Sequence, residues 1–153
     1  MPSPTFVAIA TTTVGSGGAS SIDFTSIPQT YTDLVLKISL RGSFSGVGDN
    51  IYLNINSKGN NTGITTKNVY GNGASAVSSG DLLVYTGSTA TASVFGNGEL
   101  YFPNYTSSNN KSISADTVSE NNATTAYAFM NAILWSYTEA ITTIKLTPQG
   151  GGT

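Results

Sequence analysis

Histidine and cysteine are both absent from this chain, and charged side chains are scarce. None of the 153 residues is His or Cys, and Asp, Glu, Lys and Arg together make up 9% of them, against about a quarter in an average domain. These absences exclude a Ser-His-Asp triad, a Cys nucleophile, a disulfide and the usual zinc sites. Because most catalytic machinery uses the missing side chains, the composition favours a structural or binding protein over an enzyme.

A strong net charge and a long apolar run are missing as well. The net charge is −2, and the six basic residues are scattered singly. A nucleic-acid partner needs a basic patch, so we expect none. No apolar run approaches the length of a membrane span, and residues 1–4 begin no signal peptide. We therefore expect no membrane insertion and no secretion signal. Because copies of so weakly charged a chain repel one another little, the composition also favours self-association.

What the chain has instead is alternation of apolar and polar side chains. Leu34, Leu36, Ile38 and Leu40 alternate with Val35, Lys37, Ser39 and Arg41. The same period of two recurs over residues 51–55 and 144–146. A period of two with one apolar face predicts half-buried strands.

Composition predicts further extended segments. They are rich in β-branched and aromatic residues and comprise residues 5–13, 21–24, 64–70, 82–86, 91–95, 99–102 and 111–118. Clusters of Gly, Asn and Ser separate them, and Gly and Asn tolerate the positive φ of tight turns. Many short strands between regular turn signals indicate an antiparallel sandwich or barrel. We expect an all-β, jelly-roll-like β-sandwich, with residues 1–153 forming a single domain that carries a short N-terminal arm, residues 1–4.

The segment 124–135 (TTAYAFMNAILW) is ambiguous. Its Ala, Met and Leu content suits a helix. Tyr127, Phe129, Ile133 and Trp135 share one parity, however, and the rest of the chain reads as β. The pattern favours a strand. Because the other parity is apolar too, we expect this strand to be buried on both sides.

Candidate chemistry is limited to a pair of carboxylates and a set of tyrosines. Asp116 and Glu120 are close in sequence, as the two carboxylates of a glycosidase could be, but in a chain with eight acids we expect two solvated side chains. Four tyrosines near loops, with Asn neighbours, could stack on sugars; they are Tyr70, Tyr85, Tyr101 and Tyr105. Tyrosines packed in ordinary strands are the competing interpretation. We assign no catalytic, metal-binding or cofactor-binding residue and expect no cofactor.

Several segments, in order, resemble a known kind of protein. They are residues 14–36, with IDFTSIPQTYTDLVL at their centre, then 103–112, 119–124, 134–136 and 141–144. In this order they resemble a recurring β-rich structural module of tailed-bacteriophage virion proteins, most of which are uncharacterised. The resemblance implies a virion protein made in the host cytoplasm without a signal. Its partners would be copies of itself, as a trimer, and other virion proteins such as the major capsid protein.

The resemblance leaves two locations open. A head decoration or cement protein, or a head-fibre subunit, fits a chain whose first strand is expected around Thr5, because a tail fibre normally has a separate coiled coil or shaft. The alternative is a tail-fibre or receptor-binding protein that contacts host-surface carbohydrate through polar loops. For that protein we would expect exposed tyrosines clustered at one end.

Members of this kind usually continue past the glycine run into a final strand, and here the sequence stops at Thr153. Either the sandwich closes without that strand, or a sheet edge is left open; an open edge is a pairing template that a neighbouring subunit could fill. We expect contacts with partners at the N-terminal arm and at two loops, 42–50 and 104–110. The candidate contact residues are Pro2, Pro4, Phe44, Asp49, Asn50, Tyr105, Asn109 and Asn110.

Overall fold

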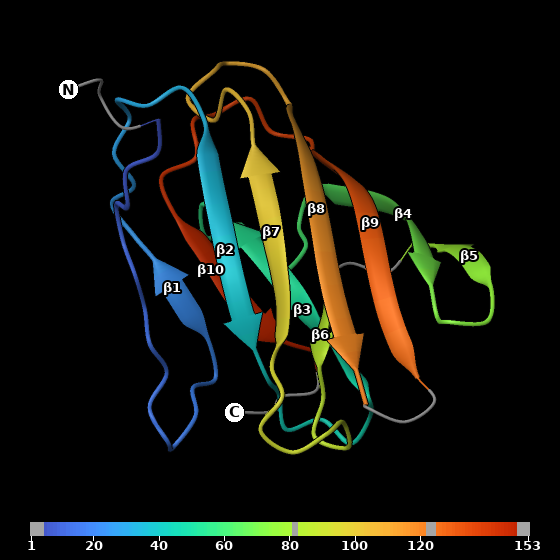
Figure 1. Ribbon diagram of the computed structural model, residues 1–153. Coiled ribbons are helices and arrows are strands. Elements are labelled where there is room, and N and C mark those ends of the chain that lie inside the picture. The colour runs from blue at the N-terminus through green and yellow to red at the C-terminus, as the bar shows by residue number, and fades with distance from the viewer. Residues whose placement is uncertain (1–4, 81–82, 122–124, 150–153) are drawn as a thin grey trace.

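Two antiparallel β-sheets packed face to face form the protein (Figure 1). The computed structural model describes residues 5–80, 83–121 and 125–149, and within these ranges it contains strands and no helix. The strands are β1 (Ile22–Phe24), β2 (Leu34–Leu40), β3 (Gly48–Ile55), β4 (Ile64–Gly71), β5 (Ala76–Ser79), β6 (Leu83–Thr86), β7 (Gly96–Phe102), β8 (Lys111–Glu120), β9 (Ala126–Trp135) and β10 (Ile144–Pro148). The predicted all-β, antiparallel sandwich is confirmed, whereas the finer description as a jelly roll stays a prediction. Over the described ranges no helix is present that could span a membrane.

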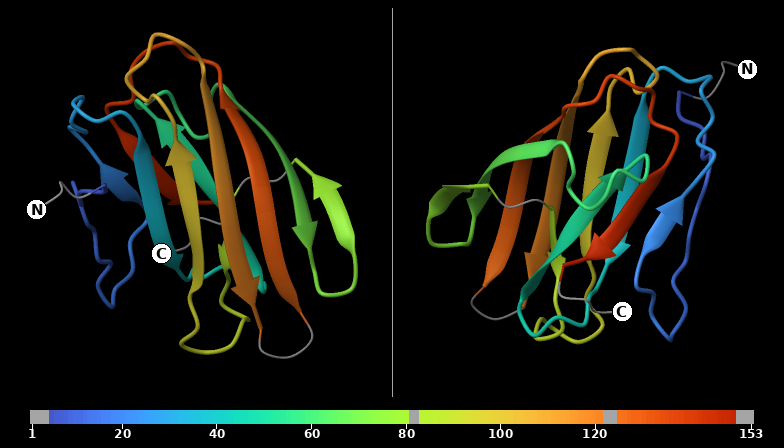
Figure 2. Two further views of the ribbon diagram at one scale, coloured as in Figure 1. Left: turned by 45° about the horizontal axis from the view of Figure 1, so that its top comes forward. Right: turned by 180° about the vertical axis from the view of Figure 1, so that it is seen from behind.

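The two sheets differ in width. The smaller has the order β1-β10-β3-β6 and the larger the order β2-β7-β8-β9-β4-β5, and each pair of neighbouring strands is antiparallel. In the right-hand view of Figure 2, seen from behind, β3 and β10 of the narrower sheet lie in front of the broader one. The free edges of the two sheets are therefore β1 and β6 on one layer and β2 and β5 on the other.

The core lies between the sheets and follows from the alternation in sequence. Leu53 and Ile55 of β3 point inward, as does Leu100 of β7, and all three are at most 1% exposed. Trp135, at the end of β9, is fully buried. Burial of one such side chain contributes about 1.5–3 kcal/mol. The strands predicted at 34–41, 51–55 and 144–146 are confirmed, and their apolar parity faces this core.

The ambiguous segment forms β9, so the prediction of a strand is confirmed. The prediction that it is buried on both sides is wrong. Its odd-numbered residues from Phe129 onward are buried, but Met130 is 74% exposed and Leu134 is 42% exposed. The physical reason is that the narrower sheet covers one face of the broader sheet, and no described part of the chain covers the other.

Two of the predicted extended segments are not strands. Residues 91–95 form a turn in which the Val94 amide donates to the Thr91 carbonyl over 3.2 Å. This turn folds around the side chain of Arg41, which determines its path. Residues 5–13 have an extended, β-branched sequence but pair with no strand among the described residues. The other composition-based strands are confirmed within a few residues, although Leu82 lies outside the described ranges.

Candidate functional site

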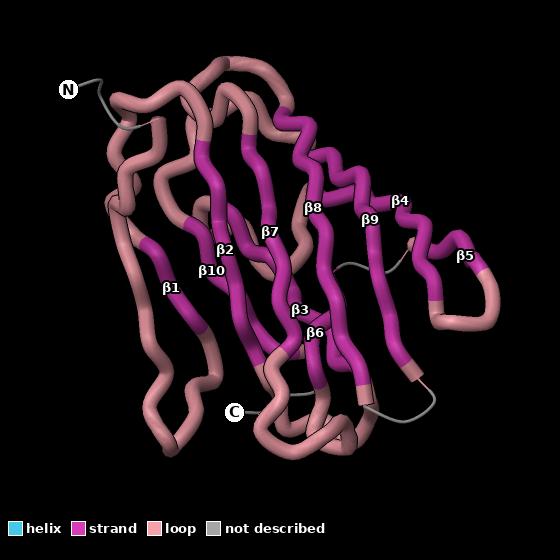
Figure 3. The backbone as a smooth tube through the Cα atoms, in the orientation of Figure 1, coloured by secondary structure: helices cyan, strands magenta, loops and turns pink. Residues whose placement is uncertain are grey.

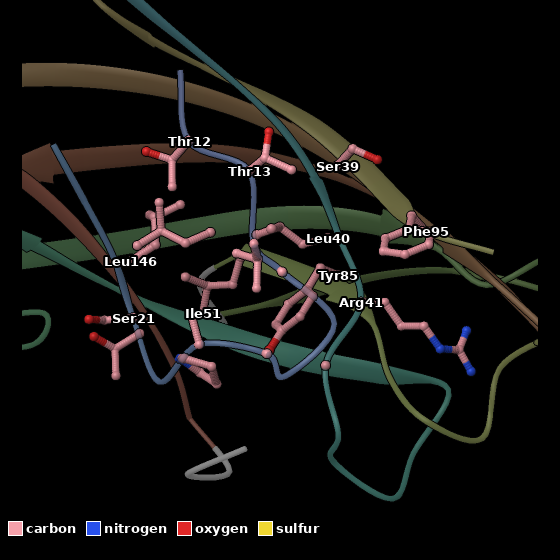
Figure 4. A pocket seen from close by; sticks show the side chains of 18 of the residues that line it. Thr12, Thr13, Ser21, Ser39, Leu40, Arg41, Ile51, Tyr85, Phe95 and Leu146 are labelled. Atoms are coloured by element: carbon pink, nitrogen blue, oxygen red, sulfur yellow. The ribbon is translucent and has the colours of Figure 1, made fainter. Parts of the chain in front are cut away.

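A cavity opens at the side of the sandwich where the free edges of the two sheets, β1 and β2, lie. Its volume is about 740 Å³. Residues 12–16 of the chain before β1 form one wall, and the ends of β2 and β10 and the middle of β3 form the others. Hydroxyl groups of Thr12, Thr13 and Ser39 border it together with apolar side chains (Figure 4).

A buried polar pair lies behind the cavity. The Tyr85 hydroxyl donates to Asp49 Oδ2 over 2.9 Å, and both residues are 4% exposed. Burial, together with this hydrogen bond, raises the pKa of Tyr85 above its ordinary value, so the phenol stays neutral. Gly42 fits against the pair because it has no side chain: a Cβ there would lie 2.6 Å from Asp49 Oδ2 and from the Tyr85 hydroxyl.

Arg41 lies beside the cavity, and its side chain reaches away from it (Figure 4). Its Nη1 donates to the carbonyls of Thr91 at 2.7 Å and Val94 at 2.9 Å. Its Nη2 donates to the carbonyls of Ser88 and Ala90, both at 3.0 Å. The guanidinium thus fixes the turn after β6. Since both Nη atoms are engaged by the protein's own backbone, the cavity suits a neutral group that carries hydroxyls or apolar surface.

A second candidate surface lies on the outer face of the broad sheet. We call the exposed Val69, Val118, Met130 and Leu134 the outer apolar patch. They are 58%, 40%, 74% and 42% exposed, and Met130 lies directly opposite Val69 across the β4–β9 pair. Ser114 and Ala132 on this face are short, whereas Asp116 lies directly opposite Met130 in the β8–β9 pair. The patch is therefore open to water and to a partner, with a carboxylate beside it.

A buried lysine fixes the loop between β7 and β8. Lys111 is 1% exposed, and its Nζ donates to the carbonyls of Ser107 at 2.8 Å, Asn109 at 2.5 Å and Glu139 at 3.0 Å. The ammonium lies 5.7 Å from the centre of the Trp135 ring. Burial lowers the pKa of Lys111 from its ordinary value. The three hydrogen bonds from Lys111 fix the backbone of the loop, so the exposed residues of the loop have fixed positions.

The predicted contact residues have different environments. Phe44 is 48% exposed, and Asn109 and Asn110 are exposed as expected. Asn50 is half-buried, and its amide donates to Gln149 Oε1 over 2.7 Å. Pro2 and Pro4 lie outside the described residues.

For Asp49 and Tyr105 the expected exposure is wrong. Asp49 is the buried partner of Tyr85. Tyr105 is fully buried, and its hydroxyl donates to the Pro28 carbonyl. A carboxylate in a turn-rich segment and a tyrosine in a loop look exposed in sequence, but each finds its hydrogen-bond partner in a distant segment.

The two predicted contact loops do not form one surface. In the antiparallel β2–β7 pair, Leu40 lies opposite Gly96 and Leu34 lies opposite Phe102. The loop after β2 and the loop after β7 are therefore at opposite ends of the sandwich, as Figure 1 shows.

The tyrosines predicted near loops do not form a sugar-stacking cluster at one end. Tyr85 and Tyr105 are buried. Tyr70 is half-buried and stacks on Phe129 with 4.7 Å between ring centres. Tyr101 is 38% exposed on the outer face, where its hydroxyl donates to Asp33.

The carboxylate pair considered from the sequence does not have the spacing of a glycosidase pair. Asp116 and Glu120 share a face of β8, and four residues along a strand span roughly 13 Å. Glycosidase carboxylates are about 5–9.5 Å apart. Among the residues that the structure describes, no three or more His, Cys, Asp or Glu side chains gather where they could hold a metal ion.

Comparisons with known proteins give no relative from which a role could be transferred. No protein-family model, no curated protein and no solved structure matches this chain. The function must therefore be argued from the geometry of the cavity and of the outer apolar patch, together with the resemblance seen in the sequence.

Proposed function

We propose that this chain is a non-enzymatic structural protein of a tailed-bacteriophage particle, a subunit that coats or stabilises the head. The observation that carries the proposal is the outer apolar patch. A soluble monomer rarely leaves a group of large aliphatic side chains together in water, and such patches mark surfaces that a partner covers. The phage setting itself rests on the resemblance of the sequence segments to virion modules.

The surface chemistry supports assembly in a second way. Only 9% of the residues are charged, and the three ion pairs among the described residues join side chains that are at least 34% exposed. Exposed pairs of this kind contribute about 0–1 kcal/mol each. Copies of the chain therefore meet with little electrostatic repulsion, while burial of apolar area favours contact.

Antibody-gold labelling of intact particles from a lysate that contains this protein tests the proposal. We expect label spread over the head. Label confined to the tail or its fibres would contradict a role at the head and support a role in host recognition. A lysate in which the protein is present but the particles carry no label would overturn the proposal of a virion protein.

A second function, contact with host-surface carbohydrate, is favoured by the cavity between β1 and β2. Its wall combines several hydroxyl groups with Phe95, which is 55% exposed, and Arg41 and Asp49 direct their charges to protein partners. A neutral sugar matches such a wall. A glycan array tests this function: binding that Phe95→Ala weakens at least tenfold would support it, and the absence of any glycan signal would exclude it for the glycans displayed.

A further inference from the structure

The chain before β1 has the sequence of a strand but no partner. We call residues 5–14 the N-terminal segment. The segment contains seven β-branched residues, which are Thr5, Val7, Ile9, Thr11, Thr12, Thr13 and Val14. Within the described parts of the chain, the segment shares no hydrogen bond with any residue. It follows the side of the molecule next to β1 as an unpaired loop (Figure 3). Ten residues of β-prone backbone thus keep their donors and acceptors open to another chain.

The apolar side chains of this segment are not buried by its own sandwich. Phe6 is 75% exposed, Val7 is 53% exposed and Ile9 is 40% exposed. Nothing in the segment is charged, so no charge opposes its entry into a sheet. A segment that combines these properties favours pairing with a sheet edge.

The same molecule also carries an open edge of suitable length. β2 pairs with β7 on one side, and no strand of the described residues pairs with its other side. It is seven residues long, while the free edges β1, β5 and β6 are three or four residues long. An edge strand presents a row of unpaired N–H and C=O groups to a further strand.

The N-terminal segment and the free edge of β2 already lie near each other. Thr12, Thr13 and Val14 line the cavity together with Ser39 and Leu40 from the end of β2. The segment passes beside this edge without forming a ladder with it. It joins β1 through a turn in which the Gly18 amide donates to the Gly15 carbonyl over 3.0 Å, with a φ of 74° at Gly18. Glycines at this point allow the segment to swing about the turn.

We infer that the N-terminal segment of one copy adds as a strand to the free edge of β2 in a second copy. Each chain carries both the segment that is donated and the β2 edge that accepts it. The exchange therefore closes into a symmetric assembly in which no segment and no β2 edge is left unpaired. A second copy is the occupant that fits, because the chain's own β2 lies beside the segment yet leaves its apolar side chains in water. The inference rests on the proposed function, since it names the contact through which the copies of a structural subunit assemble.

Cysteine cross-linking tests this contact directly, because the native chain contains no Cys. Ser39→Cys, on the exposed face of β2, is combined in turn with Val7→Cys, Ile9→Cys and Thr11→Cys, so that several registers are covered. The full-length proteins are oxidised and run on non-reducing gels. Ser39→Cys combined with Ser112→Cys, which is exposed on β8, is the matched control.

We expect at least one segment–β2 pair to form covalent dimers or larger species that the control pair does not form. Amide hydrogens of residues 6–13 should exchange at least tenfold more slowly in the oligomer than in a monomer obtained by dilution. Cross-linking only within one chain, seen as a monomer that migrates faster, would overturn the inference in favour of the chain's own β2.

Failure of this contact and failure of the proposed function are distinguishable. An oligomer or a particle-bound protein that gives no cross-link and shows unprotected amides in the segment would refute strand donation and leave the structural role standing. A protein that is monomeric in solution and absent from labelled particles would refute both.

Discussion

Replacement of Arg41 tests how the cavity and the turn beside it are held together. The guanidinium donates four hydrogen bonds to backbone carbonyls of residues 88–94 at 2.7–3.0 Å. A hydrogen bond from a charged donor contributes about 1.5–3 kcal/mol when buried. Arg41 is half-buried, so in the variant water can form some of the hydrogen bonds that the guanidinium made to these carbonyls. We therefore expect Arg41→Met to lower the free energy of unfolding by about 3 kcal/mol.

Arg41→Lys separates geometry from charge. A lysine ammonium keeps the charge but lacks the planar fork that reaches several carbonyls at once. We expect this variant to lose about 2 kcal/mol, because an ammonium has three donors and cannot reproduce the four bonds. The loss from Arg41→Met corresponds to a fall in Tm of about 6–12 °C for a chain of this size.

Urea unfolding followed by Trp135 fluorescence measures both variants. Lys67→Met is the matched control, because it removes a cation from an exposed position on β4, and we expect it to change stability by less than about 0.5 kcal/mol. Amides of residues 88–94 should exchange faster in both Arg41 variants. If Arg41→Met were as stable as the control, the guanidinium would not hold this turn and the reasoning would be refuted.

Three other variants test the buried pair, an acid-sensitive contact and the outer patch. Tyr85→Phe should cost about 1–3 kcal/mol in urea unfolding, because it removes the hydroxyl that the buried carboxylate accepts from; an unchanged midpoint would contradict this. A hydrogen bond from Asn56 is the main cause that lowers the pKa of Glu139 below its ordinary value of 4.5. The stability from Glu139 is therefore present above that value and lost as the pH falls through the lowered pKa. Thermal melts of Glu139→Gln should accordingly depend less on pH in this acid range. Met130→Asp should keep the fold, since Met130 is 74% exposed, at a small cost in stability because Asp116 lies opposite. It should reduce self-association or particle binding at least tenfold, while Thr62→Asp, at an exposed position outside the predicted contact loops, should not.

The fold was predictable because its main signal is local. Alternation at Leu34–Leu40 and at 51–55 encodes which face of each strand is buried, and the structure confirms both. At β9 the same reasoning failed on one face. Met130 and Leu134 are apolar, but the number of layers over a sheet depends on the whole chain and not on the strand's own residues.

The site was harder to predict because its contacts join distant segments. Asp49 and Tyr85 are 36 positions apart, and the donors of Arg41 reach carbonyls 47–53 positions away. A charged residue of this kind looks in sequence like any solvated one. For Lys111 the only signal was a lone cation at the start of a strand whose next four residues are uncharged. This signal does not reveal the three carbonyls that the ammonium contacts.

Native mass spectrometry of the untagged, full-length chain tests the central claim that surfaces exposed in the single chain are covered by assembly. The account predicts a defined oligomer at micromolar concentration, which Met130→Asp or deletion of residues 2–14 shifts toward the monomer. A wild-type chain that stays monomeric across this concentration range would contradict the claim.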